Sequence, residues 1–168
     1  MKPAAAVLLA AALVGLAPSV AAQAQTQPGS AALTDAAVRD FLLRQQRAWN
    51  AGDLDRYFAL YAPDAVFADQ ARTPEGRIVP YGQATLAEAR AQARRFLAKS
   101  KSTETGYVRR IEIAADGRSA QVHTDAFSRS EQDGRTRTAC LARVQTLTLA
   151  GSRLRSAGRT DSFHRCPR

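Results

Sequence analysis

The chain has 168 residues, a net charge of +9 from 24 Lys and Arg against 15 Asp and Glu, and only two cysteines and two histidines. This length is enough for one hydrophobic core that needs neither a metal nor several disulfides. The positive charge is spread from Arg39 to Arg168 with no run longer than two cations, so we expect no nucleic-acid partner. The cysteines and histidines lack the spacing of a zinc site, and we expect no metal.

Residues 1–24 have the order of a secretory signal peptide. Lys2 is followed by the apolar run AAAVLLAAALVGLA and then by small residues that suit a cleavage site. A membrane anchor is the alternative, but the apolar run is shorter than the ~20 residues that span a bilayer. We therefore expect a periplasmic or secreted protein with no membrane span after signal removal. A flexible polar leader at residues 25–31 and a single domain at 32–168 would follow.

Two helices are expected at the start of this domain. Thr34 is a good N-cap for the first helix, and Gly52 suits the left-handed position that ends it. Asp53 caps a short second helix, which Pro63 stops. Their apolar sides are predicted to be Val38, Phe41, Leu42, Gln45 and Trp49 in the first helix and Leu54, Tyr57, Phe58 and Tyr61 in the second.

The next segment combines a short strand, a loop and a third helix. Residues 65–68 are expected to form a strand that ends on Asp69. Residues 72–82 contain two prolines and two glycines and are predicted to be a loop, with a brief strand at 77–79. Thr85 and Glu88 then form a capping box for a helix that ends near residues 99–101.

The C-terminal half has the period of β-strands. Four strands are expected at residues 107–114, 119–130, 138–149 and 154–163, and the Asp-Gly pairs at 116–117 and 133–134 are typical of hairpin turns. We predict an α+β, cone-shaped fold of three N-terminal helices packed on a strongly curved, mostly antiparallel sheet. A ligand would bind inside such a cone.

Cys140 and Cys166 both lie in the predicted domain. In an oxidising compartment an even number of cysteines favours a disulfide, and two cysteines allow only one pairing. Such a bond would tie the C-terminal tail to an earlier strand and contribute ~3 kcal/mol. The alternative is a pair of unbonded buried thiols.

Residues 50–69, NAGDLDRYFALYAPDAVFAD, resemble the segment that marks the nuclear transport factor 2-like superfamily, which includes ketosteroid isomerase and SnoaL-like proteins. The similar features are the run from Trp49 to Asp55, an aromatic residue near Tyr61, the Asp64-Ala65 pair and a strand that ends in Asp69. The order of elements is similar over residues 34–164. The resemblance implies the cone fold and a homodimer formed through the open face of the sheet. It implies little about activity, because this fold carries both enzymes and binding modules.

The same resemblance places Asp69 where ketosteroid isomerase has its general base. That enzyme also needs a tyrosine and a protonated aspartate as oxyanion donors. The tyrosine position is occupied by Gln45 here, and the aspartate would fall at residues 142–144, where Arg143 is the nearest polar group. Loss of one such donor costs about 10²-fold in rate or more. We therefore expect no steroid isomerase activity of that type.

Other candidate site residues come from the spacing of polar and aromatic side chains. His123 and Asp125 are two apart on a strand, so they share a face, either as a base with its orienting carboxylate or as an exposed polar pair. Arg143 on the next strand is a candidate for binding an anionic ligand. Trp49 and Tyr61 either line a cavity or belong to the core.

Three functions remain open from the sequence. The first is an exported protein that binds a small, partly apolar molecule in its cone. The second is an isomerase or lyase that uses Asp69 as general base, with help from Gln45, His123 or Arg143. The third is an accessory interaction domain whose pocket is filled by side chains. None of the three implies a cofactor, since no phosphate-binding loop or metal cluster is present in the sequence.

Overall fold

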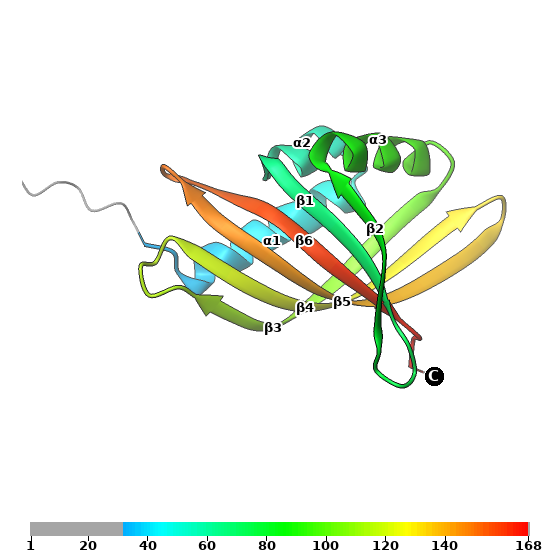
Figure 1. Cartoon of the computed structure of the whole chain (residues 1–168). Helices are drawn as coiled ribbons and strands as arrows, with labels where there is room; N and C mark the ends of the chain where they lie inside the picture. The colour runs from blue at the N-terminus through cyan, green and yellow to red at the C-terminus, as the bar shows by residue number, and fades with distance from the viewer. Residues whose placement is uncertain (1–31, 168) are drawn as a thin grey trace, which may run out of the picture.

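A computed structural model describes residues 32–167 of the chain (Figure 1). The expected signal peptide at 1–24 and leader at 25–31 lie outside these residues. Within 32–167, no helix is long and apolar enough to cross a membrane. In chain order the elements are α1 (Asp35–Asn50), α2 (Leu54–Ala59), β1 (Tyr61–Arg72), β2 (Ile78–Thr85), α3 (Leu86–Leu97), β3 (Lys101–Ile113), β4 (Ser119–Gln132), β5 (Arg135–Ala150) and β6 (Arg153–His164).

The strands form one mixed sheet with the order β2-β1-β6-β5-β4-β3. Only β1 and β6 are parallel, and every other neighbouring pair is antiparallel. The helices lie on one side of the bent sheet, with α1 along its hollow and α2 and α3 over β1 and β2 (Figure 1). The α+β class predicted from the sequence is confirmed.

Two apolar clusters join the helices to the sheet. The first lies between α1 and strands β4 and β5, and consists of Leu33, Val38, Phe41, Ala120, Val122 and Leu147. The second lies between α2, α3 and β1, and consists of Ala48, Tyr57, Phe58, Tyr61, Ala65, Phe67 and Ala93. Full burial of one large apolar side chain contributes about 1.5–3 kcal/mol, so these clusters hold the helices over the sheet.

Local capping signals place all three predicted helix starts correctly, including that of α2, where the amide of Arg56 donates to the Asp53 carboxylate at 3.0 Å. The amide of Ala37 donates to the hydroxyl oxygen of Thr34 at 3.2 Å, which confirms the predicted cap of α1. Thr85 and Glu88 form the predicted capping box at the start of α3. Gly52 adopts the expected positive φ of 68° just after α1.

The segment after α2 differs from the sequence prediction. The helix ends at Ala59, so Tyr61 begins β1 and Pro63 lies inside that strand. Pro63 is tolerated because β1 has no pairing with β6 between Tyr61 and Val66, where the missing N–H of proline is not needed. The predicted loop at residues 72–82 is shorter in the structure, where only residues 73–77 connect the two strands; the brief strand predicted at 77–79 is the start of β2, which runs on to Thr85 and pairs with β1.

The structure contains the expected bond between Cys140 and Cys166, with a Cα–Cα distance of 5.1 Å. Cys140 lies on β5, and Cys166 follows the end of β6. The predicted Asp-Gly turns are also present, with positive φ at Gly117 and Gly134. These turns connect β3 to β4 and β4 to β5, and the meander of four long strands follows from them.

Candidate functional site

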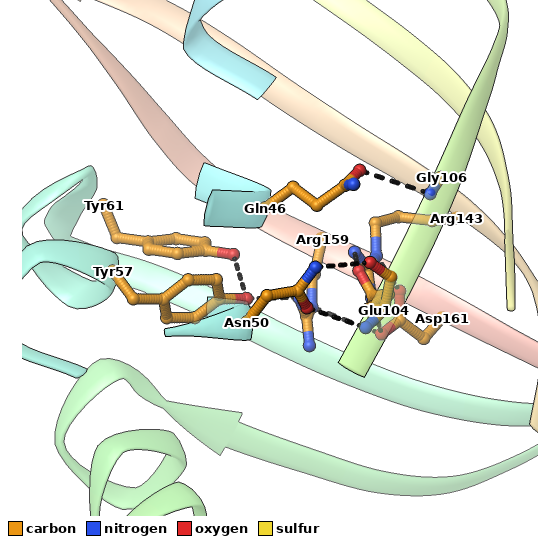
Figure 2. Close-up of polar contacts among 9 residues, drawn as sticks. All are labelled: Gln46, Asn50, Tyr57, Tyr61, Glu104, Gly106, Arg143, Arg159 and Asp161. Atoms are coloured by element: carbon orange, nitrogen blue, oxygen red, sulfur yellow. Dashed lines mark hydrogen bonds and ion pairs between the residues drawn. The ribbon is translucent and has the colours of Figure 1, made fainter. Parts of the chain in front are cut away.

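A buried ion network lies at the centre of the sheet, on the face covered by α1. The Arg143 guanidinium donates to both oxygens of Asp161, from Nε at 2.7 Å and from Nη2 at 3.0 Å. It also donates to both oxygens of Glu104, from Nη1 at 2.6 Å and from Nη2 at 3.0 Å. Arg159 pairs with Asp161 from its Nε at 3.2 Å (Figure 2). Two arginines thus face two carboxylates, and their formal charges cancel.

Strand pairing explains how this network assembles. Arg143 and Asp161 are direct neighbours across β5 and β6, so their side chains share one face. Arg159 lies two residues before Asp161 on β6 and therefore points to the same face. Glu104 comes from β3, and Arg143 reaches it across the intervening β4.

The network keeps its carboxylates ionised in spite of their burial. Burial by itself would raise the pKa of Asp161, but the charges of Arg143 and Arg159 outweigh it and lower that pKa below its usual value. Burial opposes ionisation of Glu104 in the same way, and Arg143 lowers its pKa. Conversely, the two carboxylates outweigh burial and raise the pKa of Arg143. Every member of the network is therefore charged at neutral pH.

Side chains of helix α1 hold Glu104 in place by bonding the backbone of β3. The Asn50 side-chain amide donates to the Glu104 carbonyl at 2.9 Å and accepts from the Glu104 amide at 2.7 Å. One turn earlier, Gln46 accepts from the Gly106 amide at 3.3 Å (Figure 2). Because β3 is an edge strand, these backbone groups have no further strand to pair with. The side-chain amides of Asn50 and Gln46 bond these backbone groups in place of a neighbouring strand.

Two tyrosines extend the network toward α2. The hydroxyls of Tyr57 and Tyr61 lie 3.0 Å apart, and Arg159 donates to the Tyr57 hydroxyl (Figure 2). The Arg159 guanidinium also lies 5.6 Å from the centre of the Phe67 ring, in cation–π geometry. Burial, followed by the nearby Tyr57, raises the pKa of Tyr61 well above its usual value. Tyr61 therefore remains a neutral hydroxyl in the core.

Asp69 lies beside this network and is not part of its ion pairs. It is the direct neighbour of Asp161 on the parallel strand pair β1–β6. Within residues 32–167, no hydrogen bond or ion pair holds its carboxylate. Burial, and then the charge of Asp161, raises the pKa of Asp69, while Arg159 and Arg143 oppose the shift. Asp69 is thus a half-buried carboxyl group that protonates more readily than an exposed one.

Asp69 lines a cavity of about 390 Å³, here called the outer pocket. Asp69, Arg159 and Asp161 form its charged end, and the rest is formed by Gln92 and by aromatic and small side chains from the three helices and from β1 and β6. The lining consists of Trp49, Tyr57, Phe58, Phe67, Asp69, Ala89, Gln92, Ala93, Phe96, Arg159, Asp161 and Phe163. An apolar cavity with a few convergent polar groups is the usual form of a small-molecule site.

A second cavity of about 40 Å³, here called the inner chamber, lies between α1 and strands β3 to β5. It shares Trp49 and Tyr57 with the outer pocket as common walls. Its lining consists of Leu42, Gln45, Gln46, Trp49, Tyr57, Glu104, Gly106, Val108, Thr124, Arg143 and Gln145.

The structure brings several of the sequence-predicted site residues together. Asp69 and Trp49 line the outer pocket, and Gln45, Trp49 and Arg143 line the inner chamber. Tyr61 lines neither cavity and is part of the core, with 1% of its surface exposed. The guanidinium of Arg143 is already occupied by two carboxylates, so an anionic ligand finds no free charge there.

His123 and Asp125 lie on the opposite face of the sheet. Thr124, between them, lines the inner chamber and pairs with Arg143, and side chains alternate along a strand. His123 contacts Gln121 at 3.1 Å, and Asp125 pairs with Arg109 at 2.6 Å. The two residues share a face, as expected, but neither contacts the other or either cavity.

No motif or spacing in the sequence points to Glu104, Arg159 or Asp161 as site residues. Arg159 and Asp161 alternate on a strand, a pattern equally typical of an exposed face, and Glu104 lies before the strand predicted at residues 107–114. Arg143 pairs with Glu104 and Asp161, and only the strand register brings Asp161 next to it.

Comparison with known proteins agrees with this architecture. The sequence profile of the SnoaL-like domain family matches residues 38–155. This chain belongs to the SnoaL-like domain family. The nuclear transport factor 2-like superfamily that the resemblance suggested is thereby confirmed. The sequence has no match among curated proteins.

Solved structures share the fold of this SnoaL-like domain at low sequence identity. A ketosteroid isomerase-like protein from Erwinia carotovora atroseptica is 14% identical with a TM-score of 0.60, over 76% of this chain and 94% of the other. The beta subunit of benzoate 1,2-dioxygenase from Burkholderia mallei is 14% identical with a TM-score of 0.57, over 78% and 91%. ActVI-ORFA from Streptomyces coelicolor is 17% identical with a TM-score of 0.57, over 75% and 93%. At these identities the similarity establishes the fold.

Proposed function

We propose that this SnoaL-like domain binds a small, partly apolar molecule in the outer pocket. The observation that carries the proposal is the combination of an open cavity of about 390 Å³, a largely aromatic wall and an unpaired carboxyl group, Asp69, at its polar end. A cavity of this size falls within the range of small-molecule sites. The open cavity also counts against the alternative of an interaction domain whose pocket is filled by side chains.

The pocket can be blocked from α3. Ala93 lies in the wall and is buried, so Ala93→Phe projects a ring into the cavity. Ala87→Phe is the matched control, because Ala87 is exposed on the same helix. Native mass spectrometry of protein purified from the exported fraction of its own cells should show a retained ligand in the wild type and in Ala87→Phe, and none in Ala93→Phe. An empty wild-type protein would contradict tight binding.

A second candidate function is proton abstraction by Asp69. It is favoured by the absence of any ion pair to its carboxylate within residues 32–167 and by its raised pKa, since a stronger base removes a proton more readily. The test is deuterium incorporation from D₂O next to the carbonyl of the ketone α-tetralone, followed by NMR. Asp69→Asn should lower the rate by about 10²-fold or more. Equal rates for the variant, the wild type and buffer would exclude this role for ketones.

We also propose that the domain is exported and forms a homodimer through the open face of its sheet. The bond between Cys140 and Cys166 supports export, because structural disulfides persist in oxidising compartments. A free-thiol assay on the exported protein should find no reactive thiol, whereas two reactive thiols would contradict the proposed export.

The proposed homodimer has a separate test. Sedimentation equilibrium should give the mass of a dimer, and a monomer at micromolar concentration would contradict the proposed assembly.

A further inference from the structure

The charged end of the outer pocket has one negative charge without a counter-charge. The charged residues of its lining are Asp69, Arg159 and Asp161. Arg159 pairs with Asp161 at 3.2 Å, and Arg143 pairs with both Asp161 and Glu104. Asp69 has no hydrogen bond or ion pair to any of residues 32–167. Three carboxylates thus accompany two arginines, and the carboxylate left over is that of Asp69.

Exposure and pairing direct a ligand to Asp69 and not to Arg159. Asp69 is half-buried, whereas the side chains of Arg159 and Asp161 are 19% and 3% exposed. The Arg159 guanidinium is already occupied by Asp161 and by the Tyr57 hydroxyl. An anionic ligand would therefore find no unpaired cation in the lining and would be repelled by Asp69. A positively charged ligand would supply the missing counter-charge.

The aromatic part of the wall suits a cation that is attached to an apolar body. Trp49 on α1, Phe96 on α3 and Phe163 on β6 line the pocket without being fully buried. The face of an aromatic ring is electron-rich and attracts cations, and tryptophan does so most strongly. The rings also provide apolar surface for the rest of the ligand. Carboxylate and rings therefore favour the same kind of molecule.

The net charge of +9 on the chain acts against a cation only at long range. At physiological ionic strength, exposed charges separated by more than about 8 Å are largely screened from each other. A half-buried carboxylate in direct contact with the ligand is screened much less. The local charge of Asp69 therefore decides which ligand the pocket prefers.

We propose that the outer pocket selects an organic cation, an amine with an apolar body, whose ammonium group pairs with Asp69. The proposal rests on the proposed binding function, and it adds the chemical class of the ligand. Asp69 then recognises the ligand and abstracts no proton from it. A cation beside Asp69 favours the ionised carboxylate, so binding offsets the burial that opposes ionisation in the empty pocket.

The test compares 2-phenylethylamine with 2-phenylethanol, which share a phenyl ring and a two-carbon chain. At pH 7 the amine is a cation and the alcohol is neutral. Trp49 lines the pocket and is the only tryptophan in the chain, so its fluorescence reports binding. We expect the wild-type protein to bind the amine at least tenfold more tightly than the alcohol. The anion 3-phenylpropanoate should bind more weakly than either.

Three variants locate the preference for a cation. Asp69→Asn keeps the shape of the side chain and should weaken amine binding about tenfold, with little change for the alcohol. Asp64→Asn is the matched control and should behave as the wild type, because it removes the same charge from an exposed position of β1 outside the pocket lining. Ala93→Phe, which fills the pocket, should abolish binding of both probes. Thermal melts check that all three variants remain folded.

The outcomes separate this proposal from the proposed function. Equal affinities for the amine and the alcohol in the wild type would overturn the cation site and leave ligand binding in the outer pocket intact. Equal weakening of amine binding in Asp69→Asn and Asp64→Asn would also overturn it, since the preference would then come from surface charge in general. Amine binding that survives in Ala93→Phe would place the cation elsewhere. A wild-type protein that binds no amine would overturn the cation site, while the retained ligand in native mass spectra tests the proposed function independently.

Discussion

Asp69 and Asp161 are direct neighbours on the parallel strands β1 and β6, yet their carboxyl groups have opposite electrostatic environments. Asp161 is held as a carboxylate by Arg143 and Arg159, and its charge contributes to the raised pKa of Asp69. One member of the pair is therefore structural, and the other is available to a ligand in the outer pocket.

The first prediction concerns the pH dependence of this pair. Because the folded pKa of Asp69 lies above its usual value of 3.8, ionisation of Asp69 destabilises the fold as pH rises through the folded pKa. Asp69→Asn removes that cost and should stabilise the protein at pH 7 by roughly 0.5 kcal/mol, allowing for solvent screening of a half-exposed group. The difference from the wild type should vanish below about pH 4. Urea unfolding at pH 3.5 and pH 7 measures the difference in unfolding free energy between Asp69→Asn and the wild type at each pH. A variant less stable than the wild type at pH 7 would contradict the raised pKa of Asp69.

The second prediction concerns Arg143. Arg143→Met leaves Asp161 and Glu104 buried without their shared partner, and breaking a buried ion pair in this way costs about 3–5 kcal/mol. Arg109→Met is the matched control, because Arg109 pairs with Asp125 on the exposed face and such pairs contribute about 0–1 kcal/mol. Urea unfolding at pH 7 should separate the two variants clearly. Similar losses in both would show that the network contributes no more than a surface ion pair.

The third prediction concerns the attachment of α1 to the edge strand. Asn50→Ala removes two hydrogen bonds to the backbone of Glu104 and should cost about 1–2 kcal/mol. Gln46→Ala removes one bond, to Gly106, and should cost about half as much. Hydrogen exchange followed by NMR should show faster exchange at the Glu104 amide in Asn50→Ala and at the Gly106 amide in Gln46→Ala. Unchanged exchange at these amides would mean that other contacts hold β3.

Local signals in the sequence predicted the parts of the fold that depend on neighbouring residues. The caps at Thr34, Asp53 and Thr85 are predictable, because a cap needs only residues within one helical turn. The helical spacing of Tyr61 predicts the wrong element, because its pairing with Ser156 on a distant strand overrides that spacing.

Some residues of the candidate site can be predicted from the sequence, and others depend on the register of the sheet. Asp69 and Gln45 were found through the resemblance of residues 50–69 and the spacing back from Asn50, and both line a cavity. The partners of Arg143 were missed because Asp161 and Glu104 lie 18 and 39 residues away in sequence and meet it only through the sheet register. A shared face of His123 and Asp125 was predictable, but which face it is depends on the register of the whole sheet.

The last prediction concerns Gly158, at the irregularity where β6 passes β1. Its φ is 138°, and a Cβ atom at this position would lie 2.1 Å from the carbonyl oxygen of Val66. Gly158→Ala must therefore displace the backbone of a strand that carries the outer pocket, and it should cost about 3 kcal/mol or more. Gly134→Ala is the matched control: its φ of 68° is also positive, but no atom lies within 4 Å of the added Cβ. That variant should lose only about 1 kcal/mol. Equal losses in thermal or urea unfolding would show that the positive φ, and not the close approach of Val66, requires glycine at position 158.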